Sequence, residues 1–278
     1  MKKIAVIDHS HHRKTKSNAF FLDMLKTVGA VDMFWCDSWK TGRFLDLEAL
    51  DLSVYDALVF WQVMYPLHAI TPYRDKCTLI PMYDGAWRDS DLFWLKYRGF
   101  RFVNFSRILH VRMKRLGMNS LYAQYFPMVH SAENQPADSA TKPMSAFFWQ
   151  RSTDVSWNTI KRLITYCNIE KIHYHMPDNN QSVSNGPDPD DIRQYGISFS
   201  RWFPARRSYW SLIDSVDIYF APRVREGIGL SFLEAMAMGK CVVAPDFPTM
   251  NEYIINGVNG ILYNPRSVSY THLRAHET

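Results

Sequence analysis

The sequence has no long hydrophobic run and few cysteines. No stretch approaches the roughly 18 uncharged apolar residues of a transmembrane helix, and the apolar run near Met1 is too short for the core of a signal peptide. The four cysteines form no C-x-x-C pair and show no metal-ligand spacing. These absences argue against a membrane-spanning protein, a disulfide-stapled secreted scaffold and a cysteine metal site. We therefore expect a cytoplasmic protein whose cysteines are reduced core residues.

A dinucleotide fingerprint is also missing. The predicted first strand, Lys3–Ile7, leads into a loop that contains no glycine. Dinucleotide-binding folds carry G-x-G-x-x-G at this place, because the backbone must come close to a pyrophosphate. The absence argues against a nicotinamide-dependent oxidoreductase.

What is present is the composition of a globular α/β protein, with 47% hydrophobic and 21% charged residues in 278. This length allows two domains of ordinary size. Short apolar runs alternate with segments of helical periodicity, which predicts an α/β fold. The predicted strands are Lys3–Ile7, Val31–Trp35, Ala57–Trp61, Leu79–Asp84, Ser145–Trp149, Ile172–His175, Asp217–Pro222 and Cys241–Ala244. The predicted helices are Ser17–Val28, Trp157–Tyr166, one within Trp202–Ser215, and Leu230–Met238.

Polar, proline-bearing segments divide the chain. Ser131–Pro143 is the best candidate for a linker, so we expect an N-terminal domain over 1–143 and a C-terminal domain over 144–266. A second polar stretch, Pro177–Asp191, is expected to be a surface loop. The last residues, 267–278, have no period of either kind, and we interpret them as a non-native tail.

Three histidines follow the first predicted strand, in the loop Asp8–Lys14. The carboxyl end of a strand faces the ligand crevice in an open α/β sheet. No carboxylate or cysteine stands at a recognised metal-ligand spacing from His9, His11 or His12, which favours a solvated or substrate-facing loop over a metal site. We expect His9 and His11 to lie on the acceptor side of any active site.

The most basic region, Arg88–Arg115, interleaves cations with aromatic residues. An ordinary solvated face beside core aromatics explains the pattern as well as any other hypothesis does. Docking on an anionic membrane surface is the main alternative, because Trp and Phe beside Lys and Arg suit that interface. Nucleic acid is disfavoured, because no recognised binding module accompanies the charge.

The stretch Arg225–Gly260 holds the densest pattern in the chain. A loop with two glycines, Glu226–Gly229, stands directly before the predicted helix Leu230–Met238, and Gly239 is placed to end that helix in a left-handed conformation. Glycines allow close approach of the backbone to a ligand, and the first turn of the helix offers N–H groups to a phosphate.

Two carboxylates accompany this anion-binding geometry. Glu226 lies on the loop, and Glu234 follows eight residues later in an otherwise apolar helix. Carboxylates beside a phosphate site would accept hydrogen bonds from sugar or ribose hydroxyls. The alternative, from the residues alone, is that Glu226 caps the helix and Glu234 faces solvent.

The segment EGIGLSFLEAMAMG, with its Glu-x7-Glu spacing, resembles the EGFGLxxxEAMAxG signature of family 4 retaining glycosyltransferases. The resemblance extends over Asp217–Pro265 and includes Pro248–Glu252 and Asn256–Gly260. Two departures stand out. The family's frequent Gly-Gly is replaced by Met250-Asn251, and the lysine expected five or six residues after Arg151 is absent, since Lys161 lies too far along its helix.

The resemblance implies two Rossmann-like domains facing across a cleft, the arrangement called GT-B. It implies transfer of a sugar, with retention, from a nucleotide-sugar donor to a saccharide or lipid-linked acceptor, in cell-surface polysaccharide assembly. Glu226 would orient the transferred sugar as the catalytic residue, and no metal or cofactor is implied. The residues implied to bind the donor are Glu234, Gly227, Ile228, Gly229, Leu230, Arg151 and Glu252.

Family members continue for a further helix or two, so the resemblance also implies a chain truncated at its C-terminus. The missing lysine and this truncation keep one alternative open, a non-catalytic nucleotide- or glycan-binding protein. The expected location is the cytoplasm, with peripheral attachment to the inner face of the cell membrane if Arg88–Arg115 docks there.

Overall fold

The computed structural model describes residues 1–128, 143–176, 186–201, 203 and 205–265. The chain divides into two compact units, Met1–Tyr125 (unit 1) and Phe126–Thr278 (unit 2), each of which is described by itself. The predicted linker Ser131–Pro143, apart from Pro143, and the predicted tail 267–278 lie outside the described residues.

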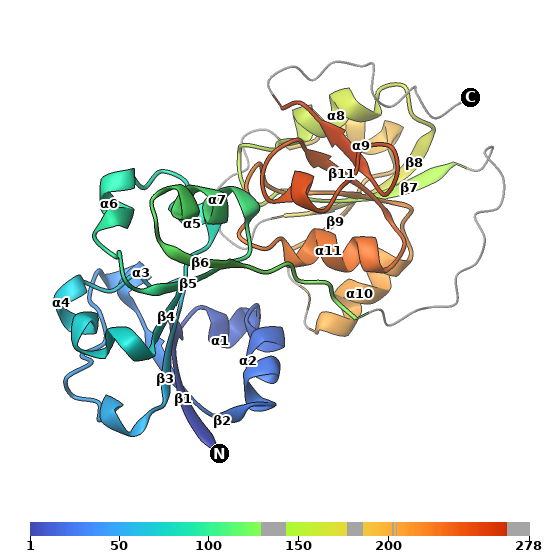
Figure 1. Ribbon diagram of the computed structural model, residues 1–278. Coiled ribbons are helices and arrows are strands. Elements are labelled where there is room, and N and C mark those ends of the chain that lie inside the picture. The colour runs from blue at the N-terminus through green and yellow to red at the C-terminus, as the bar shows by residue number, and fades with distance from the viewer. Residues whose placement is uncertain (129–142, 177–185, 202, 204, 266–278) are drawn as a thin grey trace. The chain divides into compact units, whose positions relative to one another are not determined.

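Unit 1 is built on a six-stranded parallel sheet with the order β2-β1-β3-β4-β5-β6 (Figure 1). Its strands are β1 (Lys2–His9), β2 (Gly29–Cys36), β3 (Ala57–Trp61), β4 (Cys77–Ile80), β5 (Arg101–Asn104) and β6 (Asn119–Tyr122). Its helices are α1 (His12–Thr15), α2 (Ala19–Lys26), α3 (Ser38–Thr41), α4 (Leu67–Ile70), α5 (Tyr83–Ala86), α6 (Asp91–Leu95) and α7 (Arg107–Arg115), with 3-10 turns at Leu52–Val54 and Thr71–Lys76.

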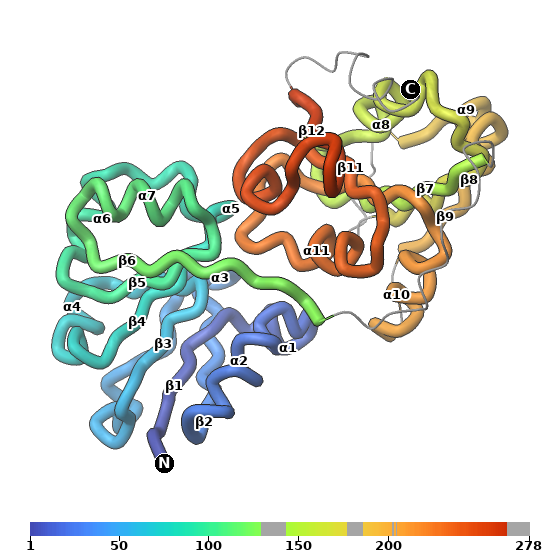
Figure 2. The backbone as a smooth tube through the Cα atoms, turned by 45° about the vertical axis from the view of Figure 1, so that its right-hand side comes forward, coloured from blue at the N-terminus to red at the C-terminus, as the bar shows by residue number. Residues whose placement is uncertain are grey.

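Unit 2 repeats this architecture with the strand order β12-β11-β10-β7-β8-β9, again all parallel (Figure 2). Its strands are β7 (Met144–Trp149), β8 (Ile169–His175), β9 (Ser198–Ser200), β10 (Ile218–Phe220), β11 (Cys241–Pro245) and β12 (Ile261–Tyr263). Its helices are α8 (Trp157–Ile164), α9 (Pro189–Gln194), α10 (Arg206–Asp214), α11 (Leu230–Ala237) and the 3-10 turn η3 (Met250–Glu252). Two parallel sheets confirm the predicted α/β class with two Rossmann-like domains.

Some local expectations were wrong. The loop Asp8–Lys14 contains the start of α1, and the expected turn at Asp84 lies inside α5. Of the expected surface loop Pro177–Asp191, residues 177–185 lie outside the described part of the chain, and its last three residues belong to α9. Cys36 and Cys77 are buried core residues as expected, whereas Cys241 is exposed at the start of β11. All four cysteines are free thiols.

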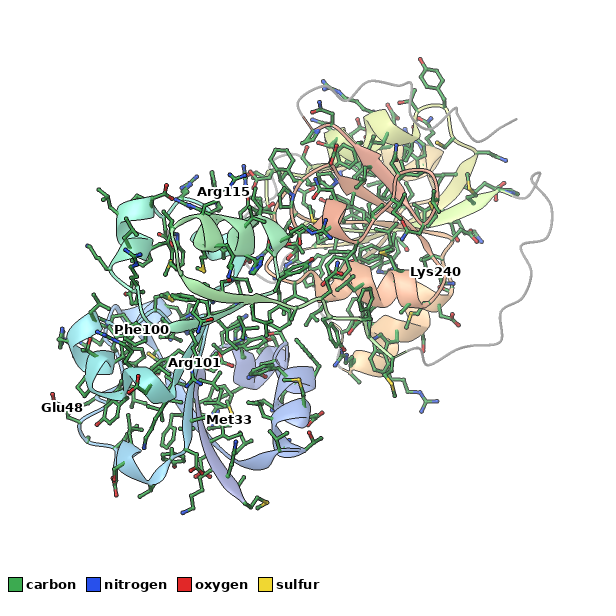
Figure 3. The ribbon with its side chains drawn as sticks, in the orientation of Figure 1. Met33, Glu48, Phe100, Arg101, Arg115 and Lys240 are labelled. Atoms are coloured by element: carbon green, nitrogen blue, oxygen red, sulfur yellow. The ribbon has the colours of Figure 1, made fainter. Side chains whose placement is uncertain are left out.

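The aromatic residues of Arg88–Arg115 belong mainly to the core. Trp94, Phe100 and Phe102 are at most 1% exposed, which removes them from any surface. Basic side chains of the same region make internal contacts as well. Arg112 Nε donates to Asp91 Oδ1 at 2.7 Å, and the Arg101 guanidinium donates to the carbonyls of Cys77 and Asp75. Figure 3 labels Phe100 beside Arg101, consecutive residues of opposite exposure.

These contacts support the solvated-face hypothesis, and docking on an anionic membrane stays a prediction. Within the described part of the chain, no helix combines the length and the apolar character that crossing a bilayer requires.

The buried aromatics of unit 1 give a stability prediction. Phe100 is fully buried and Leu92, on α6 of the same region, is 75% exposed. Phe100→Ala should lower the free energy of unfolding by about 3–5 kcal/mol, because it removes apolar contacts and leaves a cavity. Leu92→Ala should change it by less than about 0.5 kcal/mol. Chemical denaturation of both variants measures the difference, and equal effects would contradict this placement of the core.

Candidate functional site

The loop before α11 is held by a glycine in a left-handed conformation. Gly229 has φ +82° and is the residue that precedes the helix. A Cβ at this position would lie 2.0 Å from Cε1 of Phe232, so the Phe232 ring occupies the space that any other side chain needs. The chain can therefore enter α11 with this turn only through glycine. Because α11 follows β10, its first turn lies on the side of the sheet where β10 has its carboxyl end.

The other end of the helix also follows the sequence-based expectation. Gly239 has φ +73°, and its amide donates to the carbonyl of Met236. The predicted helix Leu230–Met238 is one residue longer than α11.

Glu226 is buried in the loop, with 5% of its surface exposed. Nη1 of Arg223 lies 3.9 Å from its Oε2, and the fully buried hydroxyl of Thr249 donates to its backbone carbonyl at 2.6 Å. Helix α11 has no side-chain cap, so the alternative in which Glu226 caps it is not realised. The carboxylate is instead held inside the unit by its neighbours.

Thr249 connects this loop to the second half of the signature. The 3-10 turn η3 begins directly after Thr249, and the amide of Glu252 donates to the Thr249 carbonyl at 3.0 Å. Glu252 is half-buried. The structure therefore places Glu252 one turn away from the residue that fixes the Glu226 backbone.

Glu234 has both carboxylate oxygens engaged by α10. Oε1 accepts from the guanidinium of Arg206, and Oε2 accepts from Nε1 of Trp210 at 3.3 Å. The same guanidinium lies over the Trp210 ring, 4.7 Å from its centroid. The Glu234 side chain is 14% exposed, so the alternative of a solvent-facing glutamate is not what the structure shows. The sequence did not identify Arg206 as the partner.

Two buried tyrosines lie between these charged groups. Burial raises the pKa of Tyr219 to about 12, with the Glu226 charge adding to the rise and the Arg151 charge opposing it. Burial likewise raises the pKa of Tyr209, with Glu234 adding to the effect and Arg206 opposing it. The charges of Glu226 and Arg151 have opposite effects on the pKa of Tyr219, and the role of Arg151 in donor binding stays a prediction.

Arg151 is exposed just beyond the carboxyl end of β7, and its guanidinium lies 4.5 Å from the centroid of the Trp149 ring. The turn that carries it is fixed by Gln150, which is 3% exposed. The Gln150 Oε1 accepts from the amide of Trp157 at 3.1 Å and from the hydroxyl of Tyr174 at 2.5 Å. Gln150 therefore fixes the backbone next to the exposed Arg151.

Lys161 is engaged elsewhere. Its Nζ lies 2.5 Å from Oδ1 of Asp191, whose Oδ2 accepts from the indole of Trp157 at 2.6 Å. The hydrogen bond to Asp191 raises the pKa of Lys161. This pairing ties α8 to α9 and supports leaving Lys161 out of the donor site.

In unit 1, the two histidines named from the sequence have different environments. His9 ends β1 and is half-buried, and burial lowers its pKa. His11 is exposed, with its ring 5.5 Å from that of Trp39. Both lie at the carboxyl edge of the unit 1 sheet, as expected for a substrate-facing loop.

The third histidine of the loop, His12, was not among the residues expected on the acceptor side. His12 is buried, and its Nδ1 lies 2.6 Å from Oδ1 of the fully buried Asp8. Asp8 also accepts from the side chain of Asn18 and, at 2.6 Å, from the amide of His9. The spacing of four between Asp8 and His12 was the available signal, but it becomes meaningful only because α1 begins at His12.

Among the described residues, no group of three or more His, Cys, Asp or Glu is arranged to hold a metal ion.

The family comparison concerns unit 2. Residues 183–272 match the family described as Glycosyl transferases group 1. That stretch contains the Glu226 loop, α11 and η3, and it leaves out Arg151. Unit 2 therefore carries a glycosyl transferases group 1 domain, with the match covering less than half of the chain. None of the curated proteins matches the sequence.

Solved structures share the fold of the whole chain at low identity. A glycosyltransferase from Rickettsia africae superposes with a TM-score of 0.64 at 13% identity, covering 98% of this chain and 86% of that one. Anabaena HepE in complex with UDP and glucose gives 0.61 at 15%, covering 96% and 87%. The lipopolysaccharide outer core galactosyltransferase WaaB gives 0.61 at 15%, covering 98% and 89%. The fold is that of GT-B glycosyltransferases.

The left-handed glycines give a matched pair of variants. Gly229→Ala and Gly239→Ala each place a side chain at positive φ, which costs about 1–2 kcal/mol. The Gly239 position has open space around it, whereas Phe232 fills the space beside Gly229. We expect Gly229→Ala to lower the free energy of unfolding by about 1–3 kcal/mol more than Gly239→Ala does. Denaturant titrations of both variants measure this difference, and equal losses would show that the Phe232 contact does not constrain the loop.

Proposed function

We propose that the protein is a glycosyltransferase that moves a hexose from a nucleotide-sugar to a saccharide or lipid-linked acceptor, with retention of configuration. The observation that carries the proposal is the Glu226–Gly229 loop at the start of α11 inside a glycosyl transferases group 1 domain. Polysaccharide assembly at the cell surface is the proposed process, and the cytoplasm, including the inner membrane face, is the proposed location.

The leaving group of this reaction is a nucleoside diphosphate, so catalysis requires stabilisation of the negative charge that develops on phosphate oxygen. The backbone N–H groups from Gly227 to Leu230 and the dipole of α11 would bind this anion without any metal. The guanidinium of Arg151, held on the rigid Gln150 turn, would add a full positive charge. Ile228 is buried within the loop, which keeps its backbone in place.

The two glutamates would bind neutral parts of the donor. Glu226 is buried and supported from Thr249, and we assign it to orient the transferred sugar by accepting from its hydroxyls. Glu234 would accept from the ribose hydroxyls. Because Arg206 and Trp210 occupy both of its oxygens, the ribose must share this carboxylate with Arg206 or displace it. Glu252 is a further donor-side residue in this proposal.

Anabaena HepE was solved with UDP and glucose, and with UDP-glucose. This supports a UDP-sugar as the first donor to test.

Binding without transfer is the alternative function. It is favoured by the absence of the resembling family's lysine, since Ser156 and Trp157 stand five and six residues after Arg151. Incubation with radiolabelled UDP-glucose separates the two functions. A transferase releases UDP together with labelled product, whereas a binding protein retains intact donor.

Donor binding gives the direct test. Thermal unfolding of the full chain should be measured with UDP, GDP, UDP-glucose and NAD. A ligand at about 100 times its Kd adds about 2.7 kcal/mol and shifts the Tm by several degrees. We expect UDP or GDP to produce this shift, Glu234→Gln to reduce it strongly, and the exposed Glu170→Gln of the same unit to leave it unchanged. A shift with NAD alone, or an equal shift in Glu234→Gln, would contradict the proposed site.

A further inference from the structure

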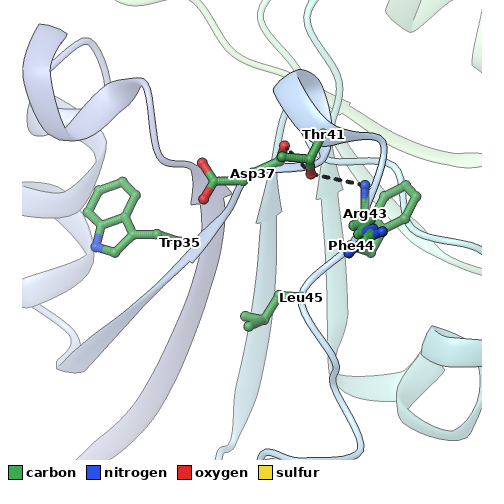
Figure 4. A pocket seen from close by; sticks show the side chains of 6 residues that line it. All are labelled: Trp35, Asp37, Thr41, Arg43, Phe44 and Leu45. Carbon is green, nitrogen blue, oxygen red and sulfur yellow. Dashed lines mark hydrogen bonds between the residues drawn. The ribbon is translucent and has the colours of Figure 1, made fainter.

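Unit 1 contains a pocket of about 490 Å³ at the carboxyl end of β2. It is formed where the chain leaves β2, passes through α3 and turns back. Figure 4 shows Trp35 and Asp37 on one side of it and Arg43 and Phe44 on the other, with Leu45 below. The six lining residues are Trp35, Asp37, Thr41, Arg43, Phe44 and Leu45.

The pocket lies at the same edge of the sheet as the histidine loop. His9 and Cys36 are paired in the register of β1 and β2, and the amide of Ser10 donates to the Cys36 carbonyl at 3.1 Å. The Ser10 hydroxyl donates to Oδ1 of Asp37. Ser10, which follows His9, is therefore hydrogen-bonded to Asp37, and Asp37 lines the pocket. Ligands of open α/β sheets bind at this carboxyl edge.

Three lining side chains are apolar and three are polar, and Asp37, Thr41, Arg43 and Phe44 are exposed residues. The Phe44 ring is 41% exposed and lies against Tyr65, with ring centroids 4.8 Å apart. The Tyr65 hydroxyl donates to the Leu45 carbonyl at 3.2 Å. The amide of Arg43 donates to the Thr41 hydroxyl at 3.1 Å, the contact drawn in Figure 4. The pocket is therefore a shaped feature of the loop and not a gap between free side chains.

This combination selects a class of ligand. A bound acyl chain would displace water from Asp37 and Arg43. It could not replace the hydrogen bonds that the water makes, and the loss of hydration of charged groups costs free energy. A pyranose ring has C–H faces that pack on apolar and aromatic surfaces, and hydroxyls at its edge that donate to a carboxylate and accept from a guanidinium. Small-molecule sites have this volume and this mixture of apolar walls and few polar groups.

We propose that this pocket binds a pyranose ring of a saccharide. The ring packs against Phe44 and Leu45 and places its hydroxyls toward Asp37 and Arg43. The assignment of this saccharide as the acceptor rests on the proposed transferase function, whereas the saccharide site itself does not. The sequence does not decide whether the acceptor is recognised through a sugar or through a lipid. In this proposal the pocket binds the sugar.

Saturation-transfer-difference NMR on the full chain, without nucleotide, tests the site. The probes are the methyl glycosides of glucose, galactose, mannose and N-acetylglucosamine. We expect at least one of them to bind, and Asp37→Ala and Phe44→Ala each to weaken its binding by about tenfold, as the loss of a charged hydrogen bond or of an apolar wall predicts.

Matched controls keep the test specific. Asp46→Ala removes another exposed carboxylate of the same loop, which accepts from the Glu48 amide, and Leu92→Ala removes an exposed apolar side chain of the same unit. Neither should change binding, and circular dichroism confirms that all four variants are folded. No binding by any probe, or binding that Asp37→Ala and Phe44→Ala leave unchanged, overturns the proposal. Because no nucleotide is present, failure of this test is distinct from failure of the donor site.

Discussion

The candidate donor site depends on one backbone conformation that only glycine can supply. Gly229 turns the chain into α11 at positive φ, with the Phe232 ring filling the place of a Cβ. This turn brings the Glu226 loop to the carboxyl edge of the sheet and directs the first N–H groups of the helix outward from it. The buried hydroxyl of Thr249 fixes the same loop from the opposite side. Without that turn, the Glu226 loop and the first turn of α11 would not keep this arrangement.

Three carboxylates of unit 2 are each set against an opposite charge. Glu226 faces Arg223, Glu234 is paired with Arg206, and Asp191 is paired with Lys161. Removing charged groups from water is expensive unless they are paired, so these contacts account for the presence of carboxylates in an apolar setting. In the proposed site, a donor would exchange these partners for its own hydroxyls, so its specificity would be a difference in free energy between two sets of contacts.

The parts of the fold that depend on local pattern were predictable. The strand Ala57–Trp61 is found with the predicted bounds, and α11 differs from its prediction by one residue. Apolar periodicity and glycine positions are properties of the local sequence, so they can be recognised without knowledge of the tertiary structure. The short helices α1 and α9 were missed, because runs of four to six residues carry no clear period.

The side-chain contacts of the candidate sites were harder to predict from the sequence. Arg206 and Glu234 are 28 residues apart in sequence, and nothing local indicates that α10 will bring them together. Asp8 and His12 are close in sequence, but their pairing needs the turn of α1 to be known. The pocket at the end of β2 is a property of a loop shape, which composition does not encode. These contacts depend on tertiary packing, which local sequence patterns do not predict.

The central claim is that a nucleoside diphosphate binds at the start of α11. Hydrogen–deuterium exchange of the full chain, with and without UDP, tests it at the level of individual segments. The account predicts that UDP slows exchange in the peptides that contain the amides of Gly227 to Leu230, because the phosphate oxygens would accept from those amides. Protection elsewhere in the chain, with unchanged exchange from Gly227 to Leu230, would contradict it.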